Sequence, residues 1–329
     1  MEYKSLFFLI KKVLGIIPLI FVVIIVNFVI IHLAPGDPVY YLAGEAGTPE
    51  FFEMTRIKLG LDKPLHEQLI KYILMVLKGD LGYSYIYGQP VSSLILSRIK
   101  ATLLLMTPAF ILSIIIGILI GAFSAKKRYS KLDIVITFLS LLGYSMPIFW
   151  LGMILLLVFA VNWRIFPVQG MFTIGSGFTS LRYFLDILHH MFLPCFVLAV
   201  YNVAVTTRLT RGSIIEVLTQ DYIVTARSNG LSENVIVLKH ALRNALLPVV
   251  TYTGMRFGTL LTGAVLTETI FAWPGLGRLL YDALSLRDYP VMMGMFIMVS
   301  ILVALSNLIT DIVYTFIDPR IRYDKFESS

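Results

Sequence analysis

The chain has 329 residues, of which 57% are hydrophobic and 14% charged, and its mean hydropathy is +0.83. Soluble domains are nearer half apolar and a quarter charged, so this composition excludes an ordinary soluble domain and a disordered chain. The formal net charge is +7, which is compatible with nucleic acid, anionic lipid or an orienting signal in membrane loops. The single cysteine, Cys195, excludes an internal disulfide and a cysteine-held metal centre.

Apolar stretches long enough to cross a bilayer, which takes about 20 residues, recur along the chain. The first is too long for the apolar part of a signal peptide, so we expect it to be retained. Pro147 is expected to bend the third. We predict an all-α polytopic membrane protein whose six transmembrane helices cover residues 13–33, 101–125, 132–160, 188–207, 249–271 and 291–317.

Basic residues are distributed unevenly between the segments that connect these helices. One side holds residues 1–12, 126–131, 208–248 and 318–329, with 15 Lys and Arg in 71 residues. The other side holds residues 34–100, 161–187 and 272–290, with 11 Lys and Arg in 113 residues. The positive-inside rule therefore predicts that both termini are cytoplasmic. Because no long block of like charge occurs, nucleic-acid binding is not expected.

The segment 34–100 shows helix signals although it lies between two spans. Thr48 can cap a helix that Gly60 ends, and apolar residues recur at helical spacing between Leu65 and Leu77. We therefore expect a small helical extracytoplasmic cap after the first span. An interfacial spacer without partners is the alternative.

The cytoplasmic segment 208–248 is the only long inner loop. Its pattern predicts a helix over Ser213–Asn229, a turn at Gly230, and a second helix from Ser232 to Leu247, with Pro248 at the start of the fifth span. A loop organised in this way favours docking to a cytosolic partner, and a self-packed solvated hairpin is the alternative. The apolar face of the first helix is expected to carry Ile215, Leu218, Tyr222 and Ala226.

Catalytic motifs are missing from the sequence. It has no phosphate-binding G-x-x-x-x-G-K-[ST] loop, no zinc-binding H-E-x-x-H and no G-x-S-x-G. Ionisable residues inside spans mark ion or substrate paths, and Arg256, Glu268 and Asp311 are the candidates for gating or interhelical pairing. None is expected at the midplane, where a proton or sodium relay would lie.

These observations favour a six-span transport protein whose energy comes from another chain. An ion-coupled secondary transporter, which needs a midplane carboxylate or inverted repeats, is the alternative from a different class. A membrane-embedded enzyme is a third alternative, but the sequence contains no paired set of catalytic residues for it. Two small-xxx-small motifs, Gly117 with Gly121 and Gly254 with Gly258, would permit close helix packing.

Seven motifs in chain order resemble the dipeptide/oligopeptide/nickel permease family of binding-protein-dependent ABC importers. The similarity is strongest to the B-type permease subunits of dipeptide importers and runs over nearly the whole chain. The motifs are Pro35–Val39, Leu59–Leu65, Gly79–Ser84, Gly143–Trp150, Asp221–Leu231, His240–Pro248 and Leu266–Arg278.

The resemblance implies a type I ABC-importer permease fold and an inner loop similar to the coupling loop of such importers. Thr225-Ala226-Arg227 stands where the general pattern has Glu-Ala-Ala, a departure that resembles the peptide and nickel branch. The residues expected to contact the ATPase, turn the loop or end it are Asp221, Tyr222, Thr225, Ala226, Arg227, Ser228, Asn229, Gly230, Leu231 and Pro248.

The resemblance also implies the partners and the cargo. These are a homologous C-type permease, two cytosolic ATPase subunits that bind ATP and Mg, and an extracytoplasmic substrate-binding protein. The chain itself is expected to hold no cofactor and no metal and to catalyse no reaction. Its substrate would be a di- or oligopeptide, with nickel chelates, glutathione or haem as alternatives, carried across a bacterial or archaeal cytoplasmic membrane.

Three parts of the chain follow from this reading. Residues 1–100 would hold the first span and the cap, residues 101–317 the permease core with the coupling loop 208–248, and residues 318–329 a cytoplasmic tail.

Overall fold

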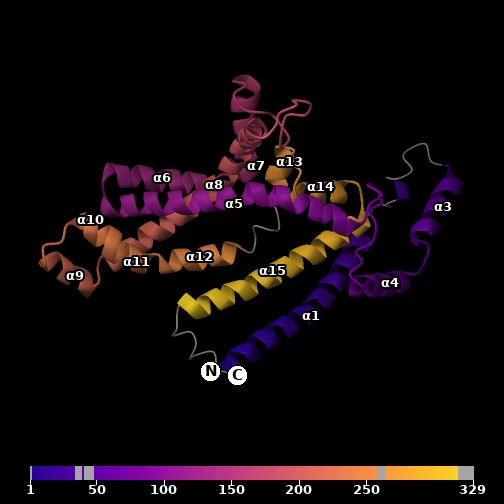
Figure 1. The fold of residues 1–329 in the computed structure, drawn as a ribbon, viewed down its shortest axis with the longest axis horizontal. Coiled ribbons are helices and arrows are strands. Elements are labelled where there is room, and N and C mark those ends of the chain that lie inside the picture. Colours follow the sequence, from indigo (N-terminus) through magenta and orange to yellow (C-terminus); the bar gives the residue numbers. More distant parts are fainter. Residues whose placement is uncertain (1, 34–38, 41–47, 258–263, 318–329) are drawn as a thin grey trace.

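The computed structural model describes residues 2–33, 39–40, 48–257 and 264–317 (Figure 1). Within these ranges the chain is helical and contains no strand, apart from an isolated antiparallel bridge between Tyr83 and Pro90. The predicted all-α class is therefore confirmed.

The helices differ greatly in length. Three of them, α1, α5 and α8, have 32, 36 and 37 residues. The elements in chain order are α1 (Glu2–Leu33), α3 (Pro49–Leu59), α4 (Leu65–Leu77), α5 (Val91–Lys126), α6 (Lys131–Ser145), α7 (Ile148–Leu155), the π-helix η1 (Leu156–Asn162), α8 (Leu181–Val217), α9 (Asp221–Ser228), α10 (Glu233–Val235), the π-helix η2 (Ile236–Ala241), α11 (Leu242–Ala245), α12 (Leu247–Phe257), α13 (Val265–Ile270), α14 (Leu276–Ser285) and α15 (Tyr289–Ile317).

Three described helices are long and apolar enough to cross a membrane, namely α5, α8 and the Tyr289–Ser306 part of α15. The third predicted span is not one helix, because α6 and the α7–η1 unit meet at 100°. Met146, at the break, has an extended backbone, since the ring of Pro147 disfavours helical geometry in the residue before it. The expected bend is thus a full interruption.

The first and fifth predicted spans are matched less closely. The apolar part of α1, Pro18–Leu33, is shorter than the three long spans. In the fifth, α12 ends at Phe257 and α13 begins at Val265, and the residues between 258 and 263 lie outside the described ranges, as does Gly258 of the second glycine motif. The count of six spans therefore stays a prediction.

Helices α5 and α8 run side by side and form the main helix pair of the fold (Figure 1). A Cβ on Gly117 would lie 2.5 Å from Cβ of Thr206, and one on Gly121 would lie 2.7 Å from the carbonyl oxygen of Thr207. Neither site has room for a side chain. The first small-xxx-small motif therefore marks the line along which the two backbones come together.

The segment between α1 and α5 has the predicted local signals. Thr48 Oγ1 accepts a hydrogen bond from the Phe51 amide at 3.3 Å, and Gly60 ends α3 with φ +71°. Tyr72 of α4 is buried in a hydrophobic cluster with Phe28 of α1 and Val91 of α5. Helix α4 is thus packed against α1 and α5, whereas α3 has no buried residue.

Asp288, at the start of α15, fastens the chain between α4 and α5. Its carboxylate is fully buried and accepts hydrogen bonds from the Ser84 hydroxyl and from the Tyr85 and Ile86 amides, the last two at 3.1 and 3.3 Å. Three donors compensate the desolvation of this charge. The segment 84–86 is therefore held to α15 by one side chain.

The packing of α5 against α8 predicts opposite effects on stability for Gly→Ala at two positions. Gly117→Ala should destabilise the protein by about 1–3 kcal/mol, because its methyl group overlaps Thr206. Gly212→Ala on α8, which meets no atom within 4 Å, should be neutral or stabilising by up to about 1 kcal/mol, because Ala favours helix more than Gly. Thermal melting of the purified protein in detergent checks both, and shifts of the same sign would contradict the packing argument.

Candidate functional site

The loop between α8 and α12 begins with a break that the sequence did not predict. Helix α8 ends at Val217, and α9 starts at Asp221, so the single helix predicted over Ser213–Asn229 is wrong. The Thr219 hydroxyl donates to the Glu216 carbonyl at 2.7 Å, and Gln220 has an extended backbone. A hydroxyl that bonds a nearby carbonyl competes with helix continuation, which explains why the chain turns here.

The break changes which residues of the loop are buried. Ile223 and Ala226 of α9 pack with Ile214 of α8, whereas the sequence placed Tyr222 on the apolar face. Tyr222 is 39% exposed, and its hydroxyl accepts a hydrogen bond from Asn244 at 2.8 Å. The predicted face is therefore wrong by one position at Tyr222.

The buried side of the loop continues into the long helices. Its cluster joins α9 and η2 to Ala122 and Ala125 at the end of α5. The fully buried members include Ile236 and Ala241 of η2. The loop is consequently a packed extension of the α5–α8 pair.

The exposed side of the loop holds most of the predicted contact residues. The exposed residues among them are Asp221, Tyr222, Thr225, Arg227, Ser228, Asn229, Gly230, Leu231 and Pro248. Gly230 has φ +75°, and its amide donates to the Arg227 carbonyl at 2.9 Å, which closes the turn after α9. Ala226 differs, since it faces the buried cluster.

Arg227 forms an ion pair across this turn. Its Nε lies 2.8 Å from Oε1 of Glu233, and the two side chains are 43% and 56% exposed. The Glu233 carboxylate holds the pKa of the Arg227 guanidinium above its usual value. An exposed pair adds at most about 1 kcal/mol to stability, so the pair orders a surface more than it stabilises the fold.

The second half of the loop is helical but irregular. Ser232 occupies the N-cap position without a side-chain hydrogen bond, and the helix that it begins changes to a π-helix over η2 and ends at Ala245. The helical stretch predicted from Ser232 to Leu247 is therefore present, but it contains a π-helical segment and ends two residues early, at Ala245. Pro248 lies in the first turn of α12, a position that tolerates the missing amide hydrogen.

An ion pair that the sequence analysis missed fixes α8 next to the loop. Asp133, in the first turn of α6, is 2% exposed and accepts two hydrogen bonds from Arg211 of α8, from Nε at 2.6 Å and from Nη2 at 2.8 Å. The Ser124 hydroxyl and the Tyr129 amide donate to the same carboxylate. The sequence signal was Ser130 three residues before Asp133, which is an N-capping pattern, but Arg211 is too far along the chain to be predicted.

Glu268 has partners on two other helices. Its carboxylate is fully buried and accepts hydrogen bonds from the Thr102 hydroxyl at 2.9 Å and from the Arg278 amide at 3.0 Å. The Leu276 amide donates to the Thr102 hydroxyl at 2.8 Å. Glu268 and Thr102 together therefore satisfy amides in the first turn of α14, which would otherwise lack partners.

Two glycines make room for this arrangement. A Cβ on Gly275 would overlap the Glu268 carboxylate, and one on Gly277 would lie 2.7 Å from Cα of Val265. Trp273, in the segment between α13 and α14, donates from its indole nitrogen to the Ala101 carbonyl at 2.8 Å. The motif Leu266–Arg278 thus joins α13 and α14 to the start of the membrane part of α5.

Of the other two predicted gating residues, the structure describes the side chain of one. Arg256 of α12 lies 5.8 Å from the ring centre of Tyr201 and 5.6 Å from that of Tyr252. The side chain of Asp311 is outside the described residues. In the described part of the chain, no group of three His, Cys, Asp or Glu side chains is arranged to hold a metal ion.

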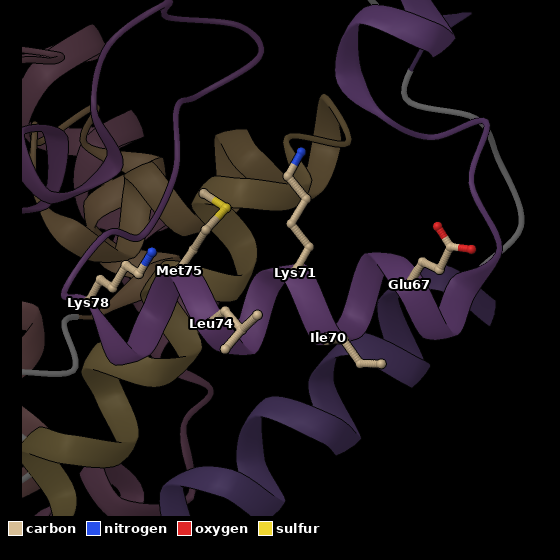
Figure 2. Close-up of a pocket in the computed structure, with 6 residues that line it drawn as sticks. All are labelled: Glu67, Ile70, Lys71, Leu74, Met75 and Lys78. Atoms are coloured by element: carbon tan, nitrogen blue, oxygen red, sulfur yellow. The ribbon is translucent and has the colours of Figure 1, made fainter.

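A cavity of about 400 Å³ lies along α4, away from these residues (Figure 2). Figure 2 shows that its lining residues come from α4 and from Lys78, which directly follows this helix. They are Glu67, Ile70, Lys71, Leu74, Met75 and Lys78. Because no second element contributes a polar group, the cavity lacks the convergent contacts of a ligand site.

The chain belongs to the family of binding-protein-dependent transport system inner membrane components. Residues 117–323 match the family's main domain, and residues 5–106 match its N-terminal domain. Both halves of the chain are thus covered.

Curated relatives match over nearly their full length. The chain is 44% identical to the dipeptide transport system permease protein DppB of Escherichia coli K12, over 97% of this chain and 99% of the relative. It is 43% identical to the oligopeptide transport system permease protein AppB of Bacillus subtilis, over 96% and 99%. It is 41% identical to the glutathione transport system permease protein GsiC of Salmonella choleraesuis, over 96% and 99%.

A solved structure shares the fold. A chain from the inward-facing MetNI methionine ABC transporter aligns with a TM-score of 0.54 and 18% identity. The alignment covers 69% of this chain and 97% of that chain. The predicted type I permease fold is supported by this neighbour.

The contacts of Glu268 predict a graded loss of stability. Glu268→Ala leaves buried donors without an acceptor and should cost about 3 kcal/mol or more, whereas Glu268→Gln keeps one acceptor oxygen and should cost less. Glu216→Ala, at an exposed carboxylate, should change stability by less than about 0.5 kcal/mol. Thermal melting in detergent measures this order, and a Glu268→Ala variant as stable as wild type would refute it.

Proposed function

We propose that this chain is the permease subunit of an ATP-driven, binding-protein-dependent importer and forms half of the translocation pathway for di- and oligopeptides across the cytoplasmic membrane. The observation that carries the proposal is the 44% identity to a dipeptide permease over 97% of the chain. The absence of catalytic motifs from the sequence agrees with a transport subunit that is not an enzyme.

The exposed side of the loop, residues 221–231, is the proposed ATPase contact. Two features support this role. The exposed residues lie on a short helix and a glycine turn, and the buried residues of the same helix pack against α5 and α8. A push on the exposed side is therefore transmitted to the long helices, because packed interiors shift as units.

The proposed importer contains further chains. A homologous C-type permease would supply the other half of the pathway, two ATPase subunits would bind ATP and Mg, and an extracytoplasmic binding protein would deliver the substrate. The excess of Lys and Arg in residues 1–12, 126–131, 208–248 and 318–329 supports cytoplasmic termini and a cytoplasmic loop. The α3–α4 segment would then face the binding protein.

The substrate has one alternative with a specific observation behind it. A relative named for glutathione transport is 41% identical, close to the 44% of the dipeptide relative. Glutathione is itself a modified tripeptide, so the same pathway chemistry would serve. Nickel chelates and haem have no relative of that kind among those compared above. Binding of candidate ligands to the cognate binding protein separates these substrates.

The proposed ATPase contact predicts uncoupling when the charge of Arg227 is reversed. In the complete importer in proteoliposomes, Arg227→Glu should lower substrate-stimulated ATP hydrolysis about tenfold or more, because a desolvated charge contact to the partner is lost. Membrane insertion should not change, since the ion pair with Glu233 is exposed and adds little to folding.

Exchanging the two charges of the ion pair distinguishes a direct contact of Arg227 with the ATPase from a role within the loop alone. Arg227→Glu with Glu233→Arg rebuilds the ion pair, and it should not restore hydrolysis if Arg227 itself contacts the ATPase. Lys239→Glu, an exposed cation in the same loop, makes the same change in net charge and should leave hydrolysis within about twofold. Full recovery in the swapped variant would show that Arg227 acts only within the loop.

A further inference from the structure

A row of aromatic and cationic side chains crosses from α6 to α8 and α12. The rings of Tyr144 and Tyr201 stack with their centres 5.4 Å apart. The Arg208 guanidinium lies 5.6 Å from the Tyr144 ring centre, and that of Arg256 lies 5.8 Å from the Tyr201 ring centre. Arg256 lies inside the fifth predicted span, where an ionisable residue almost always faces the bundle interior or a water-filled path.

One end of this row borders a cavity between α6 and α8. The cavity has a volume of about 310 Å³, within the range of small-molecule sites. Two helices contribute polar groups to it, unlike the cavity along α4. Its lining residues are Ile136, Thr137, Ser140, Thr207, Arg208 and Arg211.

The charges around the cavity do not cancel. The Arg211 guanidinium is already paired with the buried Asp133 carboxylate. Arg208 is exposed, and among the described residues no acidic side chain forms an ion pair with it. The lining therefore carries one positive charge that its own residues leave uncompensated.

A buried hydroxyl in the lining also lacks a partner. Thr207 is 1% exposed, and its Oγ1 makes no hydrogen bond within the described part of the chain. A polar atom buried in this way is costly unless a ligand or water satisfies it, and the hydroxyls of Thr206 and Thr210, outside the lining, are in the same state. Ser140, which is 8% exposed, adds a second hydroxyl to the same lining. The cavity thus combines one cation with hydroxyl groups, which is the donor set that an oxyanion requires.

We propose that this cavity binds the terminal carboxylate of a peptide during its passage, with Arg208 as the charge partner and Thr207 and Ser140 as hydrogen-bond donors. The proposal rests on the proposed function and names the residues that meet its substrate. A phospholipid phosphate is the other oxyanion of matching chemistry. The row of Tyr144, Tyr201 and Arg256 favours the peptide, because it continues for seven residues of α8, about 10 Å, beyond Arg208.

Uptake by the complete importer tests the site. In proteoliposomes with the cognate binding protein, Arg208→Gln should lower uptake of radiolabelled dialanine about tenfold, because a charge-assisted contact is lost, and Arg208→Lys should restore part of it. Binding of dialanine to the binding protein should not change. Arg128→Gln is the matched control, since Arg128 also lies over a tyrosine ring, 4.5 Å from the centre of Tyr129, but outside the cavity.

The same uptake measurement also distinguishes the peptide from the lipid alternative and tests the proposed function itself. The uptake measurement is repeated in vesicles of phosphatidylcholine alone and in vesicles that also contain phosphatidylglycerol. If Arg208→Gln lowers uptake only in the second, the site binds lipid and the proposal is overturned, as it is if uptake stays within twofold in both. If the wild-type importer takes up no dialanine while hydrolysing ATP, the proposed function fails first.

Labelling of the cavity tests its charge without a transport step. Ser140→Cys in the importer should react faster with an anionic than with a cationic methanethiosulfonate, and Arg208→Gln should reduce this ratio about fivefold or more because the cation that attracts the anionic reagent is gone. Dialanine at saturating concentration should slow the anionic reaction. No effect of Arg208→Gln on the ratio, or no protection by dialanine, would overturn the proposal.

Discussion

The close contact between α5 and α8 is the constraint on which the rest of the structure depends. It exists because Gly117 and Gly121 leave no side chain between the two backbones. Elements at both ends are built onto this pair: α4 and α15 meet α5 through Val91, and the α9–η2 loop meets it through Ala122 and Ala125. A change in the distance between the two helices would therefore reach both ends together.

Buried carboxylates hold the elements that hydrophobic packing alone would leave free to slide. Asp133 joins α6 to α8, Glu268 joins α13 and α14 to α5, and Asp288 joins the segment before α5 to α15. Each is surrounded by donors, which compensates its desolvation and fixes one geometry. Carboxylates used in this way position the helices that they join.

Local signals in the sequence predicted local structure well. Thr48, Gly60 and Gly230 end or begin helices as expected, because capping depends on a few neighbouring residues. Interactions between distant residues could not be read in the same way: the Asp133–Arg211 pair and the Glu268–Thr102 bond join residues 78 and 166 positions apart. The break at Gln220 was missed because apolar spacing through Leu218 and Tyr222 is compatible with one continuous helix, and the Thr219 hydroxyl decides against it.

The length of α5 has a mechanical consequence. Its 36 residues, with Pro108 among them, give a helix of about 54 Å along its axis, longer than the hydrocarbon thickness of a bilayer. The same unbroken helix carries Val91 in one hydrophobic cluster and Ala125 in another, so the two clusters lie on one lever. A tilt of roughly five degrees about one end would move the other end by roughly 5 Å at this length. A displacement of the loop and a displacement of the α3–α4 segment can therefore be coupled through one tilt of α5.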